Sequence, residues 1–418
     1  MEKPKLFESK KSFVWTMVVL FMLFLIHLGW EYRNYTEFIS KPFYFTHATV
    51  LNAYEKTKGK RSYQVLKLQS DEGLTFYTTT HRKMSLKDKR LRLQIFPTKQ
   101  ITFSDYLGSF YVKSRIRKSE DLPSSLKDTL REKVASQHDD ASLASFYNAI
   151  FFAIPLNKEL REKIALLGVS HLVALSGFHL GILWGLVYGL LLLLYRPLQQ
   201  RYFPYRYALF DVGMVTVSVL GLYLWFVGFP PSLLRSYAML LVGWAVLLMG
   251  MELLSFYFLF TVAALLLVLF PSLSVSLGFW LSVAGVFYIF LLLQYTRQYN
   301  KWMITFLIIP VGIFVLMLPI VHTVFGTTGP YQLLSPLLSV LFIPFYPAVM
   351  LLHLLGMGSL FDPALLWLFS LPSTGEQHLF PLWGAALYVA LSFAAIRYRY
   401  AFYLLLGIAF VYAAILFA

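Results

Sequence analysis

The hydrophobic positions of this chain follow two patterns, which change near residue 168. Before that point there is one apolar run, residues 13–30, and then short stretches in which polar and apolar residues alternate. After it, long apolar runs follow one another almost to the last residue. Runs of about 20 apolar residues are typical of transmembrane helices, whereas alternation is typical of half-buried β-strands. The pattern predicts a polytopic α-helical membrane protein with a small β-domain after its first span.

The first apolar run follows four lysines within residues 1–12. Such a segment is either a signal peptide or a retained membrane helix. The run is longer than a usual signal sequence, and no small-x-small cleavage site precedes Trp30 and Tyr32, so a retained helix over 13–30 is favoured. By the positive-inside rule, residues 1–12 are then cytoplasmic and the following segment lies outside.

Residues 41–106 are rich in β-forming side chains. Their alternating segments are 43–50, 63–68, 74–79 and 91–95. Four or five short strands in about 65 residues favour a small barrel of the OB type. We therefore expect an extracytoplasmic OB-like domain here.

Residues 107–167 have a mixed composition. Pro123-Ser124-Ser125 is expected to open a helix that runs through Val134, and a second, amphipathic helix is expected from Ala141 to Ile154. Neither is apolar enough to cross a bilayer. We expect amphipathic helices that lie at the membrane surface or cover the mouth of a pore.

Residues 168–418 contain ten further apolar runs, which brings the expected total to 10–11 spans. They are 170–195, 207–227, 233–250, 254–270, 276–296, 302–325, 332–356, 360–371, 381–396 and 400–417, the run 360–371 being short enough to be re-entrant. With a cytoplasmic N-terminus, the basic loop residues all fall inside: Arg196, Arg201, Arg206, Arg297, Lys301, Arg397 and Arg399. The same count places the C-terminus outside.

Composition narrows the classes of protein. Hydrophobic residues make up 58% of the 418 and charged residues 14%, against about 25% charged in soluble domains. A cytosolic enzyme and a disordered chain are thereby excluded. The chain has no cysteine, which excludes disulfides, thiolate catalysis, iron–sulfur clusters and cysteine zinc sites.

One stretch, residues 168–181, combines two histidines, two serines and three glycines at the mouth of an apolar span. Polar groups at membrane depth mark buried backbone or a watery cavity, so His171, Ser176, Gly177 and His179 are pore candidates. Two histidines are too few for a metal site. A Ser176–His179 nucleophile pair remains an alternative, without an evident orienting carboxylate. The favoured interpretation is a broken helix that lines a pore.

Two further stretches contribute pore candidates. Arg235 lies a few residues inside a span, where it costs roughly 2.5–3.5 kcal/mol. It either snorkels to the interface or faces a passage for anions, with Asp211 and Glu252 as possible ionic partners. Ser282 belongs to a Gly/Ser/Ala-rich face in 278–285, for which close helix packing is the stronger interpretation.

The β-domain has basic loops beside aromatic side chains. Such a surface suits nucleic acid, although a solvated charged face is an equally good interpretation. The candidate DNA-binding residues are Lys56, Lys58, Lys60, Arg61, Arg82, Lys83, Tyr63 and Tyr77.

Three stretches of the sequence resemble motifs of the ComEC family of competence proteins. Gly168-Val-Ser-His-Leu-Val-Ala-Leu-Ser-Gly-Phe-His-Leu is similar to the family's G-(I/V)-x-H-L-L-A-(I/V)-S-G-(L/M)-H-(V/I) stretch. Leu234-Arg-Ser-Tyr-Ala-Met resembles L-R-A-x-x-M, with Ser236 in place of alanine. Gly278-Phe-Trp-Leu-Ser resembles G-F-Q-L-S, with Trp280 in place of glutamine. The resemblance extends from the N-terminus to about residue 325.

The resemblance implies a channel, in residues 168–418, that passes single-stranded DNA across the bacterial cytoplasmic membrane during transformation. Many members also have a metallo-β-lactamase-like domain with H-x-H-x-D-H, which this sequence lacks, so it resembles a short form that is not an enzyme. No cofactor or metal is expected. Neither is an ATP-binding loop present, so the expected partners are DNA, lipid, an extracytoplasmic DNA receptor, a cytoplasmic motor and a separate nuclease. The oligomeric state is left open. The alternatives are an intramembrane serine hydrolase and a small-anion transporter.

Overall fold

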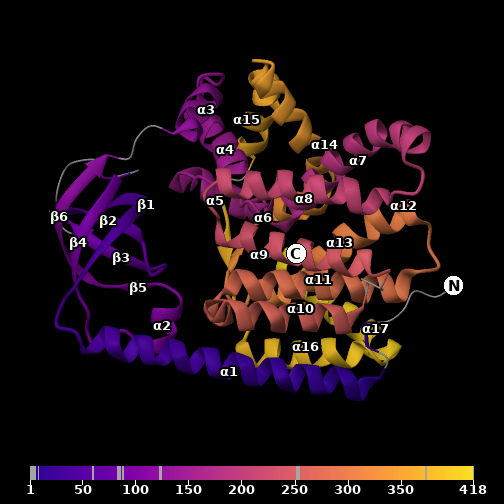
Figure 1. Ribbon diagram of the computed structural model, residues 1–418, viewed down its shortest axis with the longest axis horizontal. Coiled ribbons are helices and arrows are strands. Elements are labelled where there is room, and N and C mark those ends of the chain that lie inside the picture. Colours follow the sequence, from indigo (N-terminus) through magenta and orange to yellow (C-terminus); the bar gives the residue numbers. More distant parts are fainter. Residues whose placement is uncertain are drawn as a thin grey trace. The chain divides into compact units, whose positions relative to one another are not determined.

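The computed structural model describes residues 6–7, 9–58, 61–81, 86, 89–121, 125–250, 255–371 and 374–417 (Figure 1). The chain forms two compact units. The sheet unit consists of Phe7–Ser125 and Ala263–Leu277, and the helical unit of Met1–Leu6, Leu126–Val262 and Gly278–Ala418. Helices dominate, as the hydropathy pattern predicts.

The first helix, α1 (Lys10–Ser40), begins close to the predicted start and continues ten residues beyond the predicted end. Ser9 caps it by accepting a hydrogen bond from the Ser12 amide at 3.1 Å. Most of its apolar side chains are exposed, as in a helix that faces lipid. Its last turns differ, because Phe38 is buried in the core of the sheet unit and Tyr35 Oη donates to the Ile101 carbonyl at 2.8 Å.

The sheet has six strands in the order β5-β3-β2-β1-β4-β6. The strands are β1 (Tyr44–Lys58), β2 (Arg61–Ser70), β3 (Thr75–Thr80), β4 (Lys89–Phe96), β5 (Phe110–Tyr111) and β6 (Lys113–Asp121). The first four correspond to the four predicted strands. The last two correct the expectation that residues 107–167 are helical. Strand β6 contains six charged residues among its nine, and this composition carries little hydrophobic signal.

The two edges of the sheet approach each other, because Val112 is the one residue between β5 and β6. Its amide donates to the Tyr77 carbonyl of β3 at 2.9 Å, and the hydroxyls of Thr78 (β3) and Ser114 (β6) are 2.8 Å apart. The sheet is therefore strongly curled. Among the described residues, the strand ladders leave it open between β5 and β6.

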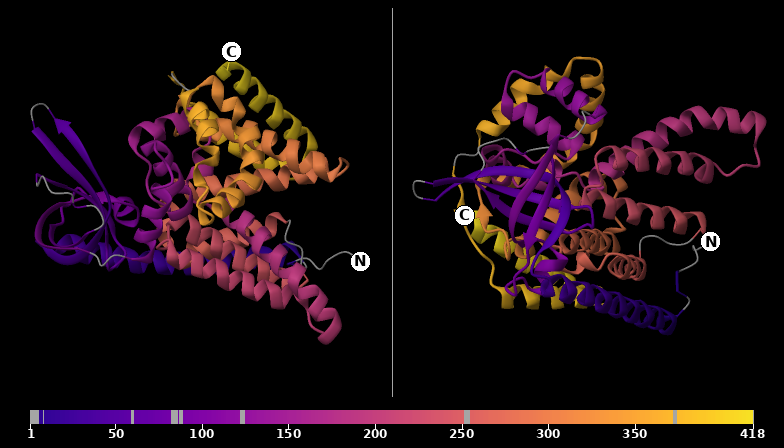
Figure 2. Two further views of the ribbon diagram at one scale, coloured as in Figure 1. Left: turned by 90° about the horizontal axis from the view of Figure 1, so that it is seen from above. Right: turned by 60° about the vertical axis from the view of Figure 1, so that its left-hand side comes forward.

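The remaining elements are mostly helices (Figure 2). Their bounds are α2 (Phe103–Leu107), α3 (Leu126–Ala135), α4 (Ala141–Phe152), α5 (Lys158–Leu166), α6 (Ser170–Val173), α7 (Gly177–Tyr202), α8 (Ala208–Phe226), α9 (Pro231–Leu248), α10 (Phe256–Leu269), η1 (Pro271–Val275), α11 (Leu277–Thr296), α12 (Lys301–Met303), η2 (Ile304–Ile308), α13 (Ile309–Val321), β7 (Thr327–Thr328), η3 (Pro330–Leu334), α14 (Ser335–Leu354), η4 (Gly358–Phe361), α15 (Asp362–Ser370), β8 (Glu376–Gln377), α16 (Leu382–Ala395) and α17 (Arg399–Phe417).

Seven helical segments in the described part of the chain are long and apolar enough to cross a membrane. They are Lys10–Ser40, Gly177–Tyr202, Ala208–Phe226, Leu277–Thr296, Lys301–Val321, Pro330–Leu354 and Arg399–Phe417. The predicted spans 233–250, 254–270 and 381–396 correspond to shorter apolar helices. The predicted span 360–371 corresponds to α15, which has nine residues. Of the 10–11 expected spans, seven are of sufficient length in the part of the chain that the structure describes.

Helix α4 differs from its predicted interfacial role. Seven of its twelve residues are buried, and they belong to the main core of the helical unit. Asp140 caps the helix through the Ser142 and Leu143 amides. The helix is therefore a core element, whereas α3 has a single buried residue, Val134.

Candidate functional site

The site begins at a break between α6 and α7, as the sequence predicts. Ala174 and Ser176 are extended, so the helix stops and restarts at Gly177. The Ser176 amide donates to His179 Nδ1 at 3.3 Å, and the Ser176 hydroxyl lies 3.4 Å from the same nitrogen. Ser176 and His179 thus form a cap for α7. The rings of His179 and Tyr346 also make a T-shaped contact.

Helix α14 packs against this break. Ser335 Oγ donates to the Gly168 carbonyl at 3.0 Å, and His171 Nε2 lies 3.2 Å from Ser339 Oγ. His171 itself is exposed.

The same helix contacts the α7–α8 hairpin at one end. Tyr346 of α14 packs against His179, near the start of α7, and its hydroxyl lies 3.3 Å from that of Tyr223, near the end of α8. Because α7 and α8 are antiparallel, these two residues lie at the same end of the hairpin. Helix α14 is also one of the candidate spans by length and composition.

Helix α9 contributes the second motif. Ser232 Oγ donates to the Leu175 carbonyl at 2.6 Å. One turn later, Ser236 lies so close to Gly177 that a Cβ at Gly177 would be 2.8 Å from Ser236 Oγ. The close approach of α7 and α9 therefore requires glycine at position 177.

The third motif meets the second at Arg235. A Cβ at Gly278, in the first turn of α11, would lie 3.2 Å from Arg235 Nη2. Ser282 is one turn further along α11, on the same face, and is exposed. The three motifs, whose outermost residues are more than 100 positions apart, thus meet through contacts among α6, α7, α9 and α11.

One expected ionic partner of Arg235 is engaged elsewhere. The carboxylate of Asp211 accepts hydrogen bonds from Arg206 Nε at 2.8 Å and Nη2 at 2.6 Å. The predicted Arg235–Asp211 pair is therefore wrong. Asp211 pairs instead with Arg206, which is only five residues away in the sequence. Glu252 lies outside the described residues.

Sequence reasoning missed a glycine stripe on α7. Gly177, Gly181, Gly185 and Gly189 recur at four-residue spacing, which places them on one helix face. A Cβ at any of the last three would meet nothing within 4 Å among the described residues. The spacing alone was the available signal. The stripe extends the site along α7 as a smooth surface.

Some of the predicted DNA-binding residues lie in the described part of the six-stranded sheet. Lys56 Nζ lies 5.8 Å from the Tyr54 ring, and Lys67 Nζ lies 5.8 Å from the ring of Tyr77. The backbones of Lys58 and Arg61 are partners in the β1–β2 ladder. Tyr63 is half-buried on β2. Of the remaining candidates, Lys60, Arg82 and Lys83 lie outside the described residues.

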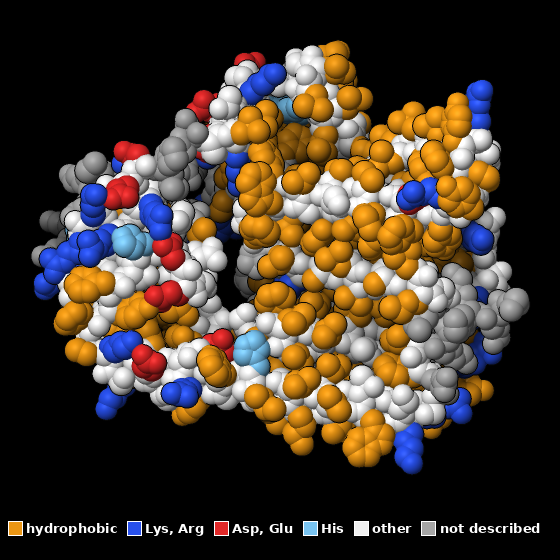
Figure 3. Space-filling model, viewed as in Figure 1, with side chains coloured by type: hydrophobic (Ala, Val, Ile, Leu, Met, Phe, Trp, Pro, Cys, Tyr) orange, Lys and Arg blue, Asp and Glu red, His pale blue; other side chains and the backbone are white. Residues whose placement is uncertain are grey.

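A hollow of about 440 Å³ in the sheet unit was not foreseen. It is lined by Thr79, Phe96, Tyr111, Lys113, Ser114 and Arg115. The Arg115 guanidinium lies 5.7 Å from the centre of the Phe96 ring. Figure 3 shows basic side chains on this unit, whereas hydrophobic side chains cover the helices. The hollow combines the cations and aromatic rings that bind single-stranded nucleic acid.

Residues 155–418, more than half of the chain, match the family model described as competence protein. The chain belongs to the ComEC family of competence proteins. No curated protein and no solved structure matches it. Membership assigns this competence protein a role in DNA uptake, and its apolar helices make it a multi-pass membrane protein. The matched residues include the converging motifs and leave out the sheet.

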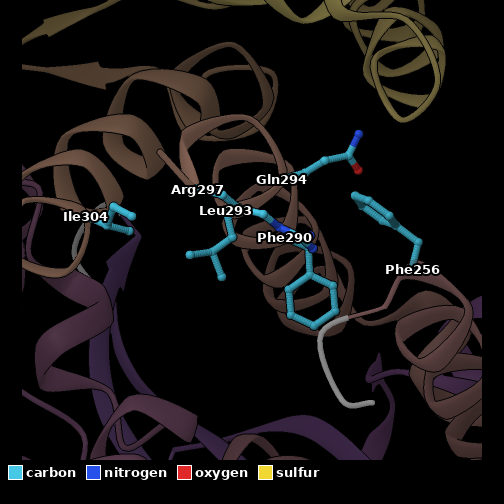
Figure 4. Close-up of a pocket in the computed structure, with 6 residues that line it drawn as sticks. All are labelled: Phe256, Phe290, Leu293, Gln294, Arg297 and Ile304. Carbon is cyan, nitrogen blue, oxygen red and sulfur yellow. The ribbon is translucent and has the colours of Figure 1, made fainter. Parts of the chain in front are cut away.

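A second hollow of the competence protein lies within the helical unit (Figure 4). It is lined by Phe256, Phe290, Leu293, Gln294, Arg297 and Ile304 and measures about 170 Å³. Ligand pockets usually measure about 300–1,000 Å³, so this hollow is smaller than a usual ligand pocket. Among the described residues, no group of three or more His, Asp or Glu side chains is placed to hold a metal ion.

Proposed function

We propose that this competence protein forms the channel that passes single-stranded DNA across the cytoplasmic membrane. The observation that supports the proposal is the convergence of the three motifs. Gly177 meets Ser236, Arg235 meets Gly278, and His171 lies beside Ser339 of α14. Residues from distant parts of the chain meet here without forming a metal site or a catalytic triad, and such a polar cluster suits a passage.

The chemistry of the cluster suits a moving polyanion. The planar guanidinium of Arg235 can pair with a phosphate through two parallel hydrogen bonds. The imidazole of His171, 3.2 Å from Ser339 Oγ through Nε2, adds hydrogen-bonding capacity. The glycine stripe of α7 presents a surface free of side chains. One strong cationic contact beside a smooth wall would recognise DNA without trapping it.

The six-stranded sheet is proposed to contact DNA outside the membrane. Its strand order, with β5 parallel to β3 and β6 antiparallel to β4, supports an OB-like arrangement. The hollow at Phe96 and Tyr111 supplies stacking surfaces. The proposed topology places residues 1–12 inside and both the six-stranded sheet and the C-terminus outside. A DNA receptor outside and a motor inside are the partners that the proposal requires.

We expect Tyr111→Ala to weaken binding of single-stranded DNA by the full-length protein about 5–100-fold, since base stacking contributes roughly 1–3 kcal/mol per base. Tyr111 is 52% exposed. Fluorescence anisotropy with labelled oligonucleotides measures the affinity. Tyr202→Ala is the control, because Tyr202 has a similar exposure, 57%, and lies at the end of α7. Equal affinities of the two variants would exclude the hollow as a DNA site.

The channel itself is tested by deleting the gene in a transformable host and restoring it. Labelled DNA is then measured outside the membrane and in the cytoplasm. We expect DNA to remain outside in the deletion strain and to enter after restoration. Equal cytoplasmic DNA in both strains would overturn the proposal.

The same assay separates the channel from a serine hydrolase. Ser176→Ala removes a helix cap, which costs about 1 kcal/mol, so a channel keeps most of its activity. A hydrolase that uses Ser176 would lose all of it. The geometry favours the channel, because His179 Nδ1 is engaged by the cap and no carboxylate among the described residues hydrogen-bonds to its Nε2.

A further inference from the structure

A chain of hydrogen bonds lies apart from the motif cluster in the helical unit. His138, between α3 and α4, has Nδ1 2.9 Å from Asp362 Oδ2, at the start of α15. Its Nε2 lies 2.9 Å from His353 Nε2, at the end of α14. His353 Nδ1 lies 2.6 Å from the Val349 carbonyl oxygen. Both histidines are buried, and Tyr147 stacks on the His138 ring at 4.5 Å.

The protons in this chain can be counted. The Val349 carbonyl only accepts hydrogen bonds, so His353 Nδ1 carries a hydrogen. If the Asp362 carboxylate is ionised, His138 Nδ1 carries one too. Two bare nitrogens, or two N–H groups, would repel at 2.9 Å, so one hydrogen lies between the two Nε2 atoms. Three protons are thus shared, and the charge of the resulting imidazolium is balanced by Asp362. The count is the same if Asp362 holds a proton and donates to Nδ1.

We propose that His138, His353 and Asp362 form a proton-binding site that fastens the α3–α4 turn to the α14–α15 turn. We call this site the histidine latch. Gln137 supports the same junction, since its Nε2 donates to the His353 carbonyl at 3.1 Å and its Oε1 accepts from the Gly358 amide at 2.8 Å. The ligand of the site is one shared proton. The inference goes beyond DNA transfer and does not depend on it.

The groups that face the latch leave it electrically isolated. Tyr147 faces it from α4, and burial, with Asp362 as a lesser cause, raises the pKa of its phenol, so Tyr147 is neutral. From the α3 side the facing group is the neutral Gln137. Asp140 caps α4 through the Ser142 amide at 2.6 Å. Asp362 is therefore the counter-charge for the shared proton.

The proton count fixes the pH dependence of closure. An ordinary solvated imidazole has a pKa of about 6.5. Above that pH, an open latch holds two ring protons, so closure takes up one, and the closed-to-open ratio falls about tenfold per pH unit. Below it, both open rings become charged, closure releases a proton, and the ratio falls again as the pH drops. The latch is therefore most closed near neutral pH.

The experiment uses the absence of cysteine from the chain. Spin labels at Ser136→Cys and Ser359→Cys, both exposed positions on either side of the latch, report the distance across it by pulsed electron resonance. The full-length protein in lipid nanodiscs is measured from pH 5 to pH 9. We expect a short distance near pH 6.5 and a growing long-distance population on both sides. A distance distribution that does not change with pH would overturn the proposal.

Two variants complete the test. Asp362→Asn leaves the shared charge unbalanced, so we expect the closed-to-open ratio on the alkaline side to fall about tenfold or more, which moves the midpoint at least one pH unit lower. The matched control is His322→Gln, because His322 is also buried but bonds to the Leu318 carbonyl and Thr328. An identical pH profile for Asp362→Asn and the unsubstituted latch would also overturn it. The readout contains no DNA, so failure of the channel proposal would leave it unaffected.

Discussion

Replacing Arg235 with alanine is expected to lower DNA entry into the cytoplasm about 10–100-fold, since a hydrogen bond to a charged group contributes roughly 1.5–3 kcal/mol. The guanidinium lies beside Gly278, where the second and third motifs meet. Alanine removes the proposed phosphate contact. The measurement is labelled DNA in the cytoplasm, at equal amounts of membrane-inserted protein.

Two substitutions make this result specific. Arg235→Lys keeps the positive charge but loses the planar fork, so an intermediate loss is expected. Arg206→Ala removes a cation that is paired with Asp211 and lies outside the motifs, so near-normal entry is expected. If Arg235→Ala transfers DNA as well as Arg206→Ala does, Arg235 does not contact the strand.

Replacing Gly177 with alanine is expected to destabilise the protein by about 1–3 kcal/mol through overpacking. The new methyl group would lie 2.8 Å from Ser236 Oγ and 3.2 Å from its Cβ, so α7 and α9 must separate. This displacement also moves Arg235, and we expect DNA entry to fall about tenfold or more for a shift of about 1 Å. Thermal unfolding in detergent and the DNA-entry assay provide the two measurements.

The partner residue offers a second-site test. Ser236→Ala removes the nearer of the two clashing atoms, so it should partly restore the stability of Gly177→Ala. The control is Gly185→Ala on the same helix face, where a Cβ meets nothing within 4 Å. There we expect unchanged or higher stability, because alanine favours a helix over glycine by about 1 kcal/mol. Equal losses at positions 177 and 185 would show that the contact with Ser236 is unimportant.

Periodicity and local chemistry predicted much of this molecule from sequence. The four alternating segments became β1–β4, and the broken helix expected within 168–181 is the break between α6 and α7. These features depend on neighbours in the chain. The three motifs were also found individually, but their convergence is a property of the folded chain.

The missed features depend on distant contacts. Strand β6 is polar because it pairs at a sheet edge, and only its partner β4 gives it a place in the sheet. His138 and His353 are 215 positions apart, and a single histidine in either segment carries no signal of the other.

The length of α1 has a mechanical consequence. A helix of 31 residues is about 46 Å long, whereas the hydrocarbon core of a bilayer is about 30 Å thick. Roughly 16 Å of helix therefore extends beyond the lipid, and this part carries Phe38 into the sheet core. Because one continuous helix joins the membrane to the sheet, a tilt or rotation of α1 within the bilayer displaces the whole sheet.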